Sequence, residues 1–197
     1  MMDKRIAFVF PGQGAQYSGM GKSLYEHSPA ARAVFDMADS IRPGTSRQCF
    51  EGTKEELTQT ANTQPCLFCV DLAAAEALRE AGIVPAMLAG FSLGEMAALT
   101  FSGAVSMEEG FRLVCRRGEL MQAAAEKTGG AMMAVLKLEN SVVESVCHRY
   151  EAVYPVNYNC PGQLVVAGKK EQLELFKNDI REAGGRAVPL AVGGGFH

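Results

Sequence analysis

The sequence predicts an α/β protein with a small second subdomain, and three observations carry this prediction. Short apolar runs at residues 6–10 and 84–89 alternate with helix-like stretches in the first part of the chain. A Gly-Phe-Ser-Leu-Gly sequence at residues 90–94 follows the second run and opens a helix-like segment, which is the strand–turn–helix setting of a nucleophile elbow. Residues 129–192 read strand–helix–strand–strand–helix–strand, the order of a ferredoxin-like unit.

Capping and breaker residues set the expected elements of the first part. Residues 53–56 and 106–109 have the pattern of capping boxes. Pro65 is expected near a helix start, where its missing N–H costs little, and Gly82 is the expected C-cap of that helix. We therefore expect strands over 6–10 and 84–89, and helices over about 21–40, 53–57, 64–82, 95–99 and 106–127.

The second part is expected to hold strands over 131–138, 152–157, 163–167 and 186–192, and helices over 141–150 and 171–183. A capping box with Glu144 is expected to begin the first of these helices. The predicted domains are 1–128 as the core, 129–192 as the small subdomain, and 193–197 as a return to the core. Because the core offers only two confident strands, we expect the chain to be the front part of a longer protein.

Composition narrows the class of protein. The chain has 197 residues, of which 48% are hydrophobic, enough for a globular core. A net charge of −3 argues against a nucleic-acid partner, and no apolar run has the length of a membrane span. The apolar run near the N-terminus is too short for a signal peptide and lacks a cleavage site, so we expect a cytoplasmic protein.

The six cysteines are expected to be reduced thiols in such a protein. Cys66 and Cys69 form a CxxC pattern, which is also found in zinc and redox sites. They lie on one apolar face of an expected helix, and the chain has no second CxxC. We therefore predict buried core thiols here and no metal site.

Two segments are candidates for nucleophilic catalysis. The elbow presents Ser92, and the N–H of Leu93 faces a developing oxyanion; an ordinary Gly/Ser turn is the alternative. The loop at residues 12–16 lacks the P-loop pattern and the third glycine of a dinucleotide fingerprint. The N–H of Gln13 in this loop is a candidate second oxyanion donor, and a flexible loop is the alternative.

A serine nucleophile needs a base, and the chain has three histidines. His27 is expected at the surface and His148 in a structural role, so His197, which follows a glycine-rich stretch, is the candidate base. Arg117 lies on a partly apolar helix face, from which a guanidinium can bind a carboxylate in a bidentate manner. The alternative for Arg117 is a snorkelling surface arginine.

These residues together resemble the malonyl-CoA:acyl-carrier-protein transacylases, the acyltransferases of fatty-acid and polyketide synthesis. The resemblance covers essentially the whole chain. It implies an α/β-hydrolase-like core with an inserted ferredoxin-like subdomain, the C-terminal part of the core being absent. It rests on ordered motifs: Phe-Val-Phe-Pro-Gly-Gln-Gly-Ala-Gln at 8–16, Gly-Phe-Ser-Leu-Gly-Glu at 90–95, Arg-Gly-Glu-Leu-Met-Gln at 117–122, Asn-Cys-Pro-Gly-Gln at 159–163 and Phe-His at 196–197.

The resemblance also implies roles. Ser92 is the nucleophile, His197 the general base, and the backbone N–H groups of Gln13 and Leu93 form the oxyanion hole. Arg117 binds the free carboxylate of the malonyl group. The reaction is a ping-pong transfer, without a cofactor, from malonyl-CoA to the phosphopantetheine thiol of acyl carrier protein through a malonyl-serine. The substrate site is expected to include Phe91, Asn159 and Phe196.

Two departures from the family pattern matter. Phe91 replaces the usual histidine beside the nucleophile and is expected to reshape the acyl pocket. Family members continue well beyond the catalytic histidine, so a 197-residue product is expected to be poorly stable and weakly active or inactive. The competing readings are a serine hydrolase or thioesterase, and a non-catalytic fragment that docks a carrier protein through Arg112, Arg116 and Lys127. The pathway and the oligomeric state stay open.

Overall fold

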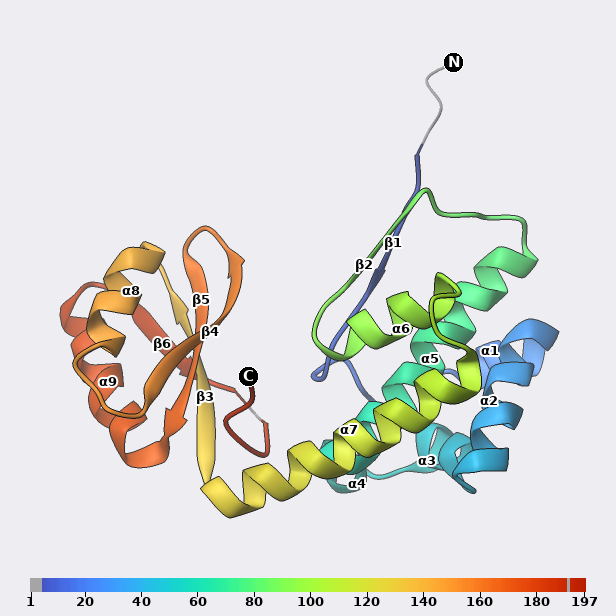
Figure 1. Cartoon of the computed structure of the whole chain (residues 1–197), viewed down its shortest axis with the longest axis horizontal. Helices are drawn as coiled ribbons and strands as arrows, with labels where there is room; N and C mark the ends of the chain where they lie inside the picture. The colour runs from blue at the N-terminus through green and yellow to red at the C-terminus, as the bar shows by residue number, and fades with distance from the viewer. Residues whose placement is uncertain (1–4, 191) are drawn as a thin grey trace. The chain divides into compact units, whose positions relative to one another are not determined.

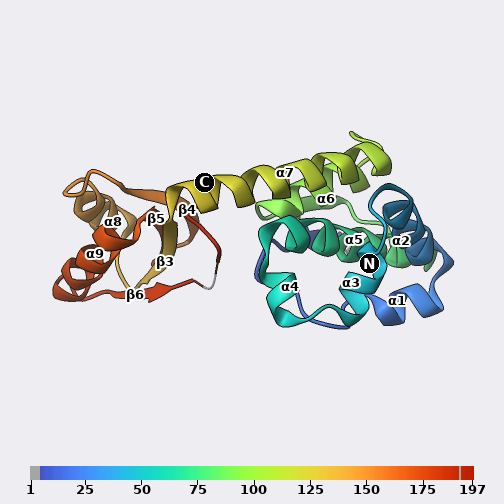
Figure 2. The ribbon, with the colours of Figure 1, turned by 90° about the horizontal axis from the view of Figure 1, so that it is seen from below.

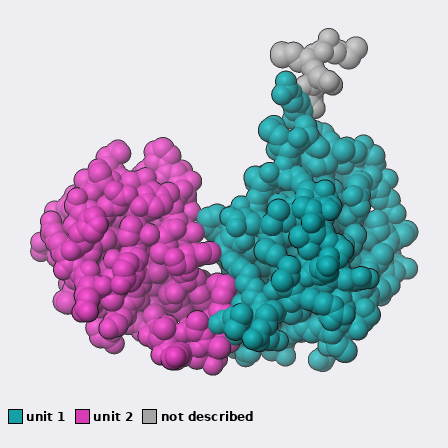
Figure 3. All heavy atoms as spheres, in the orientation of Figure 1, with its two compact units in different colours: residues 1–120 teal, residues 121–197 magenta. Residues whose placement is uncertain are grey.

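The computed structural model describes residues 5–190 and 192–197 and shows an α/β structure. The chain forms two compact units, residues 1–120 (unit 1) and 121–197 (unit 2), coloured teal and magenta in Figure 3. The division falls inside helix α7, Met107–Thr128, so the last turns of this helix belong to unit 2. The boundary expected from the sequence is residue 128, at the end of this helix.

Unit 1 consists of helices packed beside a short parallel sheet (Figure 1). Its strands pair with Ala7 opposite Met87, and the side chains of Phe8 and Phe10 face the core. The opposite face of the sheet carries apolar side chains in solvent, with Val9 76% exposed. The elements are β1 Ala7–Phe10, α1 Lys22–His27, α2 Pro29–Ile41, α3 Thr45–Glu51, α4 Lys54–Thr58, α5 Thr60–Glu80, β2 Met87–Gly90, α6 Leu93–Phe101 and the first turns of α7.

Unit 1 confirms several local predictions. Thr53 and Glu56 form the predicted capping box at the start of α4, and Ser106 and Glu109 bond reciprocally at the start of α7. Gly82 follows the end of α5 with φ 82°, as expected for a glycine C-cap. Local hydrogen-bonding groups in the sequence therefore located three helix ends in this unit.

Three predictions for unit 1 were wrong. The helix expected over 21–40 is two helices, because the Ser28 hydroxyl accepts the Ala31 N–H at 3.1 Å and Pro29 begins α2. Helix α3 was not expected at all. Helix α5 begins at Thr60, so Pro65 lies inside the helix and not in its first turn.

Unit 2 has its elements in the predicted order of strand, helix, two strands, helix and strand. Its sheet is antiparallel with the strand order β4-β5-β3-β6, and Figures 1 and 2 show both helices on the same side of it. The other face packs Phe196 with Ala125 of α7. The elements are β3 Gly130–Leu136, α8 Asn140–Cys147, β4 Val153–Cys160, β5 Gln163–Lys169, α9 Lys170–Glu182 and β6 Arg186–Pro189.

Two expectations for unit 2 need correction. Ser141 lies inside α8, whose N-cap is Glu139, so the predicted capping box does not form; Glu144 instead accepts the Tyr158 hydroxyl at 2.7 Å. The last strand ends at Pro189, before the predicted end at Val192, and residue 191 of the predicted span lies outside the described residues.

The cysteines of the CxxC pattern are buried in α5, as predicted. Among the described residues, no group of three or more His, Cys, Asp and Glu side chains is arranged to hold a metal ion. Within the same residues, no helix combines the length and apolarity that crossing a bilayer requires.

Candidate active site

Ser92 occupies a strained turn between β2 and α6. Its backbone has φ 52° and ψ −100°, a conformation that residues with a Cβ seldom adopt. A Cβ on Gly90 would collide with the backbone of Gly94, and one on Gly94 would collide with the carbonyl of Phe10. Both positions therefore need glycine, and the strand–turn–helix geometry predicted for this motif is confirmed.

The N-terminus of α6 begins directly after Ser92. The N–H of Gly94 donates to the Phe91 carbonyl at 2.9 Å, and that of Glu95 donates to the Ser92 carbonyl at 3.3 Å. Leu93 is the first residue of α6, where an N–H has no acceptor within the helix. The Ser92 hydroxyl makes no capping bond to the helix. The positive end of the helix dipole therefore lies beside the serine.

The glycine-rich loop after β1 lies against this elbow. The N–H of Phe91 donates to the Phe10 carbonyl at 3.0 Å, and a Cβ on Gly12 would stand 2.6 Å from the Phe91 carbonyl oxygen. The side chain of Gln13 is half-buried and donates to the Thr60 hydroxyl at 3.2 Å. The loop is therefore tied to the start of α5, which argues against a flexible loop.

Arg117 reaches the serine from α7. Its Nη2 donates to Ser92 Oγ at 3.1 Å, and its Nη1 donates to Gln64 Oε1 at 2.7 Å. Burial lowers the pKa of Arg117, and the charge of Glu95 opposes this shift. Within the described residues, both hydrogen bonds of the guanidinium go to neutral oxygens. A half-buried guanidinium in this position has the chemistry to bind an anionic group next to Ser92.

Two further residues of this site, Thr60 and Gln64, are not among those that the sequence predicts. Thr60 and Gln64 are 1% exposed and lie one turn apart on α5, where they hold Gln13 and Arg117 respectively. Gly118 lets α7 approach this turn, since a Cβ there would lie 3.1 Å from the Thr60 carbonyl. The available signal was a polar residue, Gln64, directly before an apolar run.

The remaining predicted site residues lie in unit 2. Phe196 is buried, whereas His197 is exposed and lines a pocket of 350 Å³ with Tyr154 and Lys169. Asn159 is exposed near the end of β4 and donates to Gln163 at 3.0 Å. The pairing of Ser92 with His197 stays a prediction.

The other two histidines lie on helix ends. His27 is exposed and its Nδ1 bonds with the Ser23 carbonyl at 2.9 Å, in agreement with its expected surface position. His148 is exposed at the C-cap of α8.

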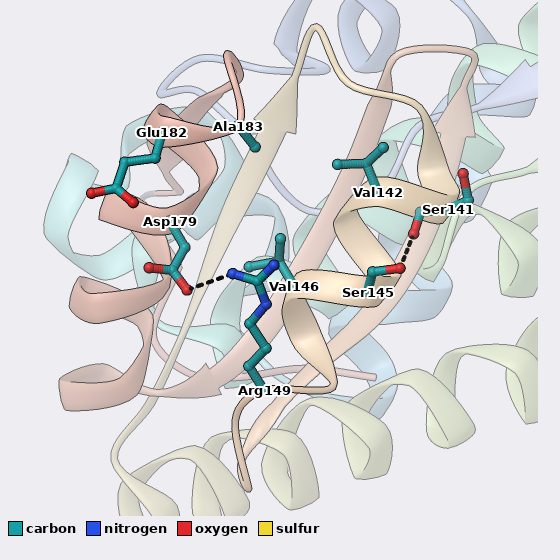
Figure 4. A pocket seen from close by; sticks show the side chains of 8 residues that line it. All are labelled: Ser141, Val142, Ser145, Val146, Arg149, Asp179, Glu182 and Ala183. Carbon is teal, nitrogen blue, oxygen red and sulfur yellow. Dashed lines mark hydrogen bonds and ion pairs between the residues drawn. The ribbon is translucent and has the colours of Figure 1, made fainter.

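A pocket of 430 Å³ lies between the two helices of unit 2 (Figure 4). Arg149 forms an ion pair with Asp179 there at 3.5 Å, and the Ser145 hydroxyl donates to the Ser141 carbonyl at 2.8 Å. None of the predicted site residues lines this pocket. It therefore does not compete with the elbow as a candidate active site.

Comparison with known proteins gives a consistent result. Residues 7–197 match the family model described as the acyl transferase domain. The chain is 44% identical over 199 residues to the malonyl CoA-acyl carrier protein transacylase of Bacillus subtilis (strain 168), covering 98% of this chain and 63% of that protein. This chain therefore spans less than two thirds of the length of that relative.

Solved structures of similar proteins show the same fold. A malonyl CoA-acyl carrier protein transacylase from Clostridium perfringens superposes with a TM-score of 0.92 at 37% identity, covering 98% of this chain and 63% of that one. A malonyl-transacylase in complex with its type II PKS acyl-carrier protein superposes with a TM-score of 0.91 at 37% identity, covering 98% and 64%.

Proposed function

The chain belongs to the acyl transferase domain family, and from this premise we propose that it transfers malonyl groups in fatty-acid biosynthesis. The donor is malonyl-CoA and the acceptor is the phosphopantetheine thiol of acyl carrier protein. The names of the similar proteins support this proposal, as does the similar transacylase seen with its acyl-carrier protein. We place the reaction in the cytoplasm.

The contact between Arg117 and Ser92 carries the proposal. Nη2 of Arg117 lies 3.1 Å from Ser92 Oγ, so a malonyl ester on this oxygen carries its free carboxylate within reach of the guanidinium. A carboxylate offers two oxygens to the planar guanidinium, and burial strengthens the attraction. An acetyl group has no such carboxylate, so the site favours malonyl.

The mechanism has two half-reactions. His197 takes the proton of Ser92, whose oxygen attacks the thioester carbon of malonyl-CoA. The backbone N–H groups of Leu93 and Gln13 stabilise the oxyanion that forms, and the CoA thiol leaves with the proton from His197. The carrier thiol then attacks the malonyl-serine ester by the reverse sequence and regenerates Ser92.

The finer architecture is part of the proposal. In unit 2, the order β4-β5-β3-β6 places the first and third strands of the unit in the centre, which supports a ferredoxin-like subdomain over 129–192. Residues 1–128 form an α/β-hydrolase-like core, to which residues 193–197 return. We propose Phe91, Asn159 and Phe196 as residues that line the substrate site.

The test is mass spectrometry of the intact purified protein after exposure to malonyl-CoA, followed by peptide mapping. We expect one malonyl adduct located on Ser92, and we expect acyl carrier protein to remove it while itself gaining the malonyl group. Loss of the adduct to water at the same rate with and without carrier would identify a hydrolase. An adduct elsewhere, or none with malonyl-CoA present in excess, would contradict the proposal.

Replacing Gln64 with leucine is expected to lower kcat/KM for malonyl-CoA about tenfold, since Arg117 loses one neutral acceptor that fixes its plane. Replacing Gln64 with glutamate is expected to raise KM further, because the new carboxylate competes with the malonyl group for Arg117. Steady-state kinetics at several malonyl-CoA concentrations separates the two effects. Gln59→Leu, an exposed glutamine just before α5, is the control. Similar kinetics for Gln64→Leu and Gln64→Glu would refute the positioning role.

A further inference from the structure

Two buried thiols that the proposed reaction does not use meet between α3 and α5. Cys49 on α3 and Cys66 on α5 are both 0% exposed. The Cys49 thiol donates to the Cys66 carbonyl oxygen at 3.6 Å, and the two thiols also hydrogen-bond to each other. The two cysteines are neighbours in the fold, on helices separated along the chain by the whole of α4.

Polar side chains lie beside the Cys66 thiol. The Cys66 thiol donates to Gln48 Oε1 at 3.3 Å, and this oxygen also accepts from Nη1 of Arg42 at 3.0 Å. The hydrogen bond from Cys49 lowers the pKa of Cys66, and the charge of Arg42 acts in the same direction. The bond to Cys66 and burial raise the pKa of Cys49. Cys66 is therefore the member that ionises first, and Cys49 is the proton donor beside it.

A pocket lies beside this pair, although neither cysteine lines it. It has a volume of 310 Å³ and is lined by Arg42, Arg47 and Gln48, among others. Arg42 and Gln48 are the two side chains that contact each other beside the Cys66 sulfur. Helix α3 has only seven residues, between Gly44 and Gly52, and a peroxide in this pocket reaches the thiols only if this helix opens locally.

We propose that Cys49 and Cys66 are an oxidisable dithiol that closes to a disulfide between α3 and α5 when a peroxide enters this pocket. The thiolate of Cys66 attacks one peroxide oxygen, the O–O bond breaks, and a sulfenic acid and one water form. The Cys49 thiol then attacks the sulfenic sulfur, and the second water leaves as the S–S bond forms. Two thiols lose two electrons and one hydrogen peroxide becomes two waters.

Two other buried thiols, Cys69 and Cys147, differ from Cys66 in the direction of their pKa shift. Burial raises the pKa of Cys69 on the same helix, and it raises that of Cys147 in unit 2 to about 11. Both stay protonated at neutral pH, and a thiol reacts with peroxide far more slowly than a thiolate. The proposal therefore predicts selective oxidation, in contrast to the general loss of thiols that unfolding produces.

The test treats the native full chain with graded hydrogen peroxide, blocks remaining thiols with N-ethylmaleimide under denaturing conditions, and maps tryptic peptides without reduction. Trypsin cleaves after Lys54, which separates Cys49 from Cys66. We expect a cross-linked peptide pair lighter by two hydrogen atoms, with Cys147 still blocked by maleimide as an internal reference. The same pair in Cys69→Ser assigns the bond to Cys66.

Two variants test the order of events. In Cys49→Ser we expect a sulfenic acid at Cys66 that dimedone traps. In Arg42→Gln we expect disulfide formation to slow about tenfold, because the Cys66 thiolate loses a neighbouring cation. A cross-link to Cys69, faster oxidation of Cys147, or a Cys49–Cys66 bond that forms only once circular dichroism shows unfolding would overturn the proposal. The wild-type mapping alone suffices if a variant does not fold.

Discussion

Arg117→Ala is expected to lower malonyl transfer by about 10²–10³-fold and to change acetyl transfer by less than about tenfold. The guanidinium lies 3.1 Å from Ser92 Oγ and is half-buried, so its bonds to a malonyl carboxylate form in a poorly screened setting. A buried pairing of this kind contributes about 3–4 kcal/mol, and each 1.4 kcal/mol is a tenfold change in rate. Parallel assays with malonyl-CoA and acetyl-CoA measure the ratio directly.

The neighbouring arginine is a matched control. Arg116 is exposed and its ion pair with Glu119, at 3.1 Å, lies at the surface. Arg116→Ala removes the same charge from the same helix and is expected to leave both rates within about twofold, since exposed ion pairs contribute little. Equal losses of malonyl and acetyl transfer in Arg117→Ala would eliminate the carboxylate role and leave only a structural one.

Asp71→Asn is expected to raise the free energy of unfolding by about 3–5 kcal/mol at pH 8.5 and above, with almost no change near pH 4. Asp71 is 7% exposed on α5, and among the described residues its Oδ2 has no hydrogen-bond partner. Burial raises the pKa of this carboxyl from 3.8 to about 8. The folded protein therefore carries a neutral acid where the unfolded chain carries a carboxylate.

The sign of the pH dependence follows from this shift. Below pH 4 the carboxyl is protonated in both states, and its contribution to stability is fully present. As the pH rises from 4 to 8, the folded state holds one more proton than the unfolded state, so stability falls with pH. Above pH 8 the carboxyl is ionised in both states, and its contribution to the free energy of unfolding is lost completely. The Asp71→Asn variant avoids this loss because its amide stays neutral.

Denaturant unfolding of both proteins at several pH values measures this difference. Glu108→Gln removes an exposed acid from the first turn of α7 and is expected to shift stability by less than about 0.5 kcal/mol at every pH. A constant difference between wild type and Asp71→Asn across the pH range would show that the carboxyl is ionised in the folded protein.

Local chemistry made part of the fold predictable. The capping box at residues 53–56 and the elbow at 90–94 depend on residues within five positions of one another, and the structure confirms both. Helix α3 was missed because it buries only Thr45 and Cys49 and so lacks an apolar stripe. The start of α5 was misplaced because Gln64, although polar, is buried by tertiary packing.

The candidate site also combines residues that a local motif positions with residues that only tertiary packing brings together. Ser92 and Leu93 could be predicted, since the elbow alone positions them. The bond between Arg117 and Gln64 joins residues 53 positions apart, and it exists only because α5 and α7 pack closely at Gly118. No local sequence pattern predicts the contact between Arg117 and Gln64. The sequence therefore indicated a guanidinium on a helix face, but not the side chain that orients it.

The turn of α5 that holds Thr60 and Gln64 has one more consequence for the proposed reaction. One residue anchors the loop of Gln13 and the other anchors Arg117, so helical pitch fixes the separation of the two anchors at about 5–6 Å. In the proposed reaction, this turn therefore sets the distance between the oxyanion donor at Gln13 and the guanidinium that binds the acyl carboxylate. A succinyl group, one methylene longer than malonyl, presents its carboxylate too far from the thioester to match it.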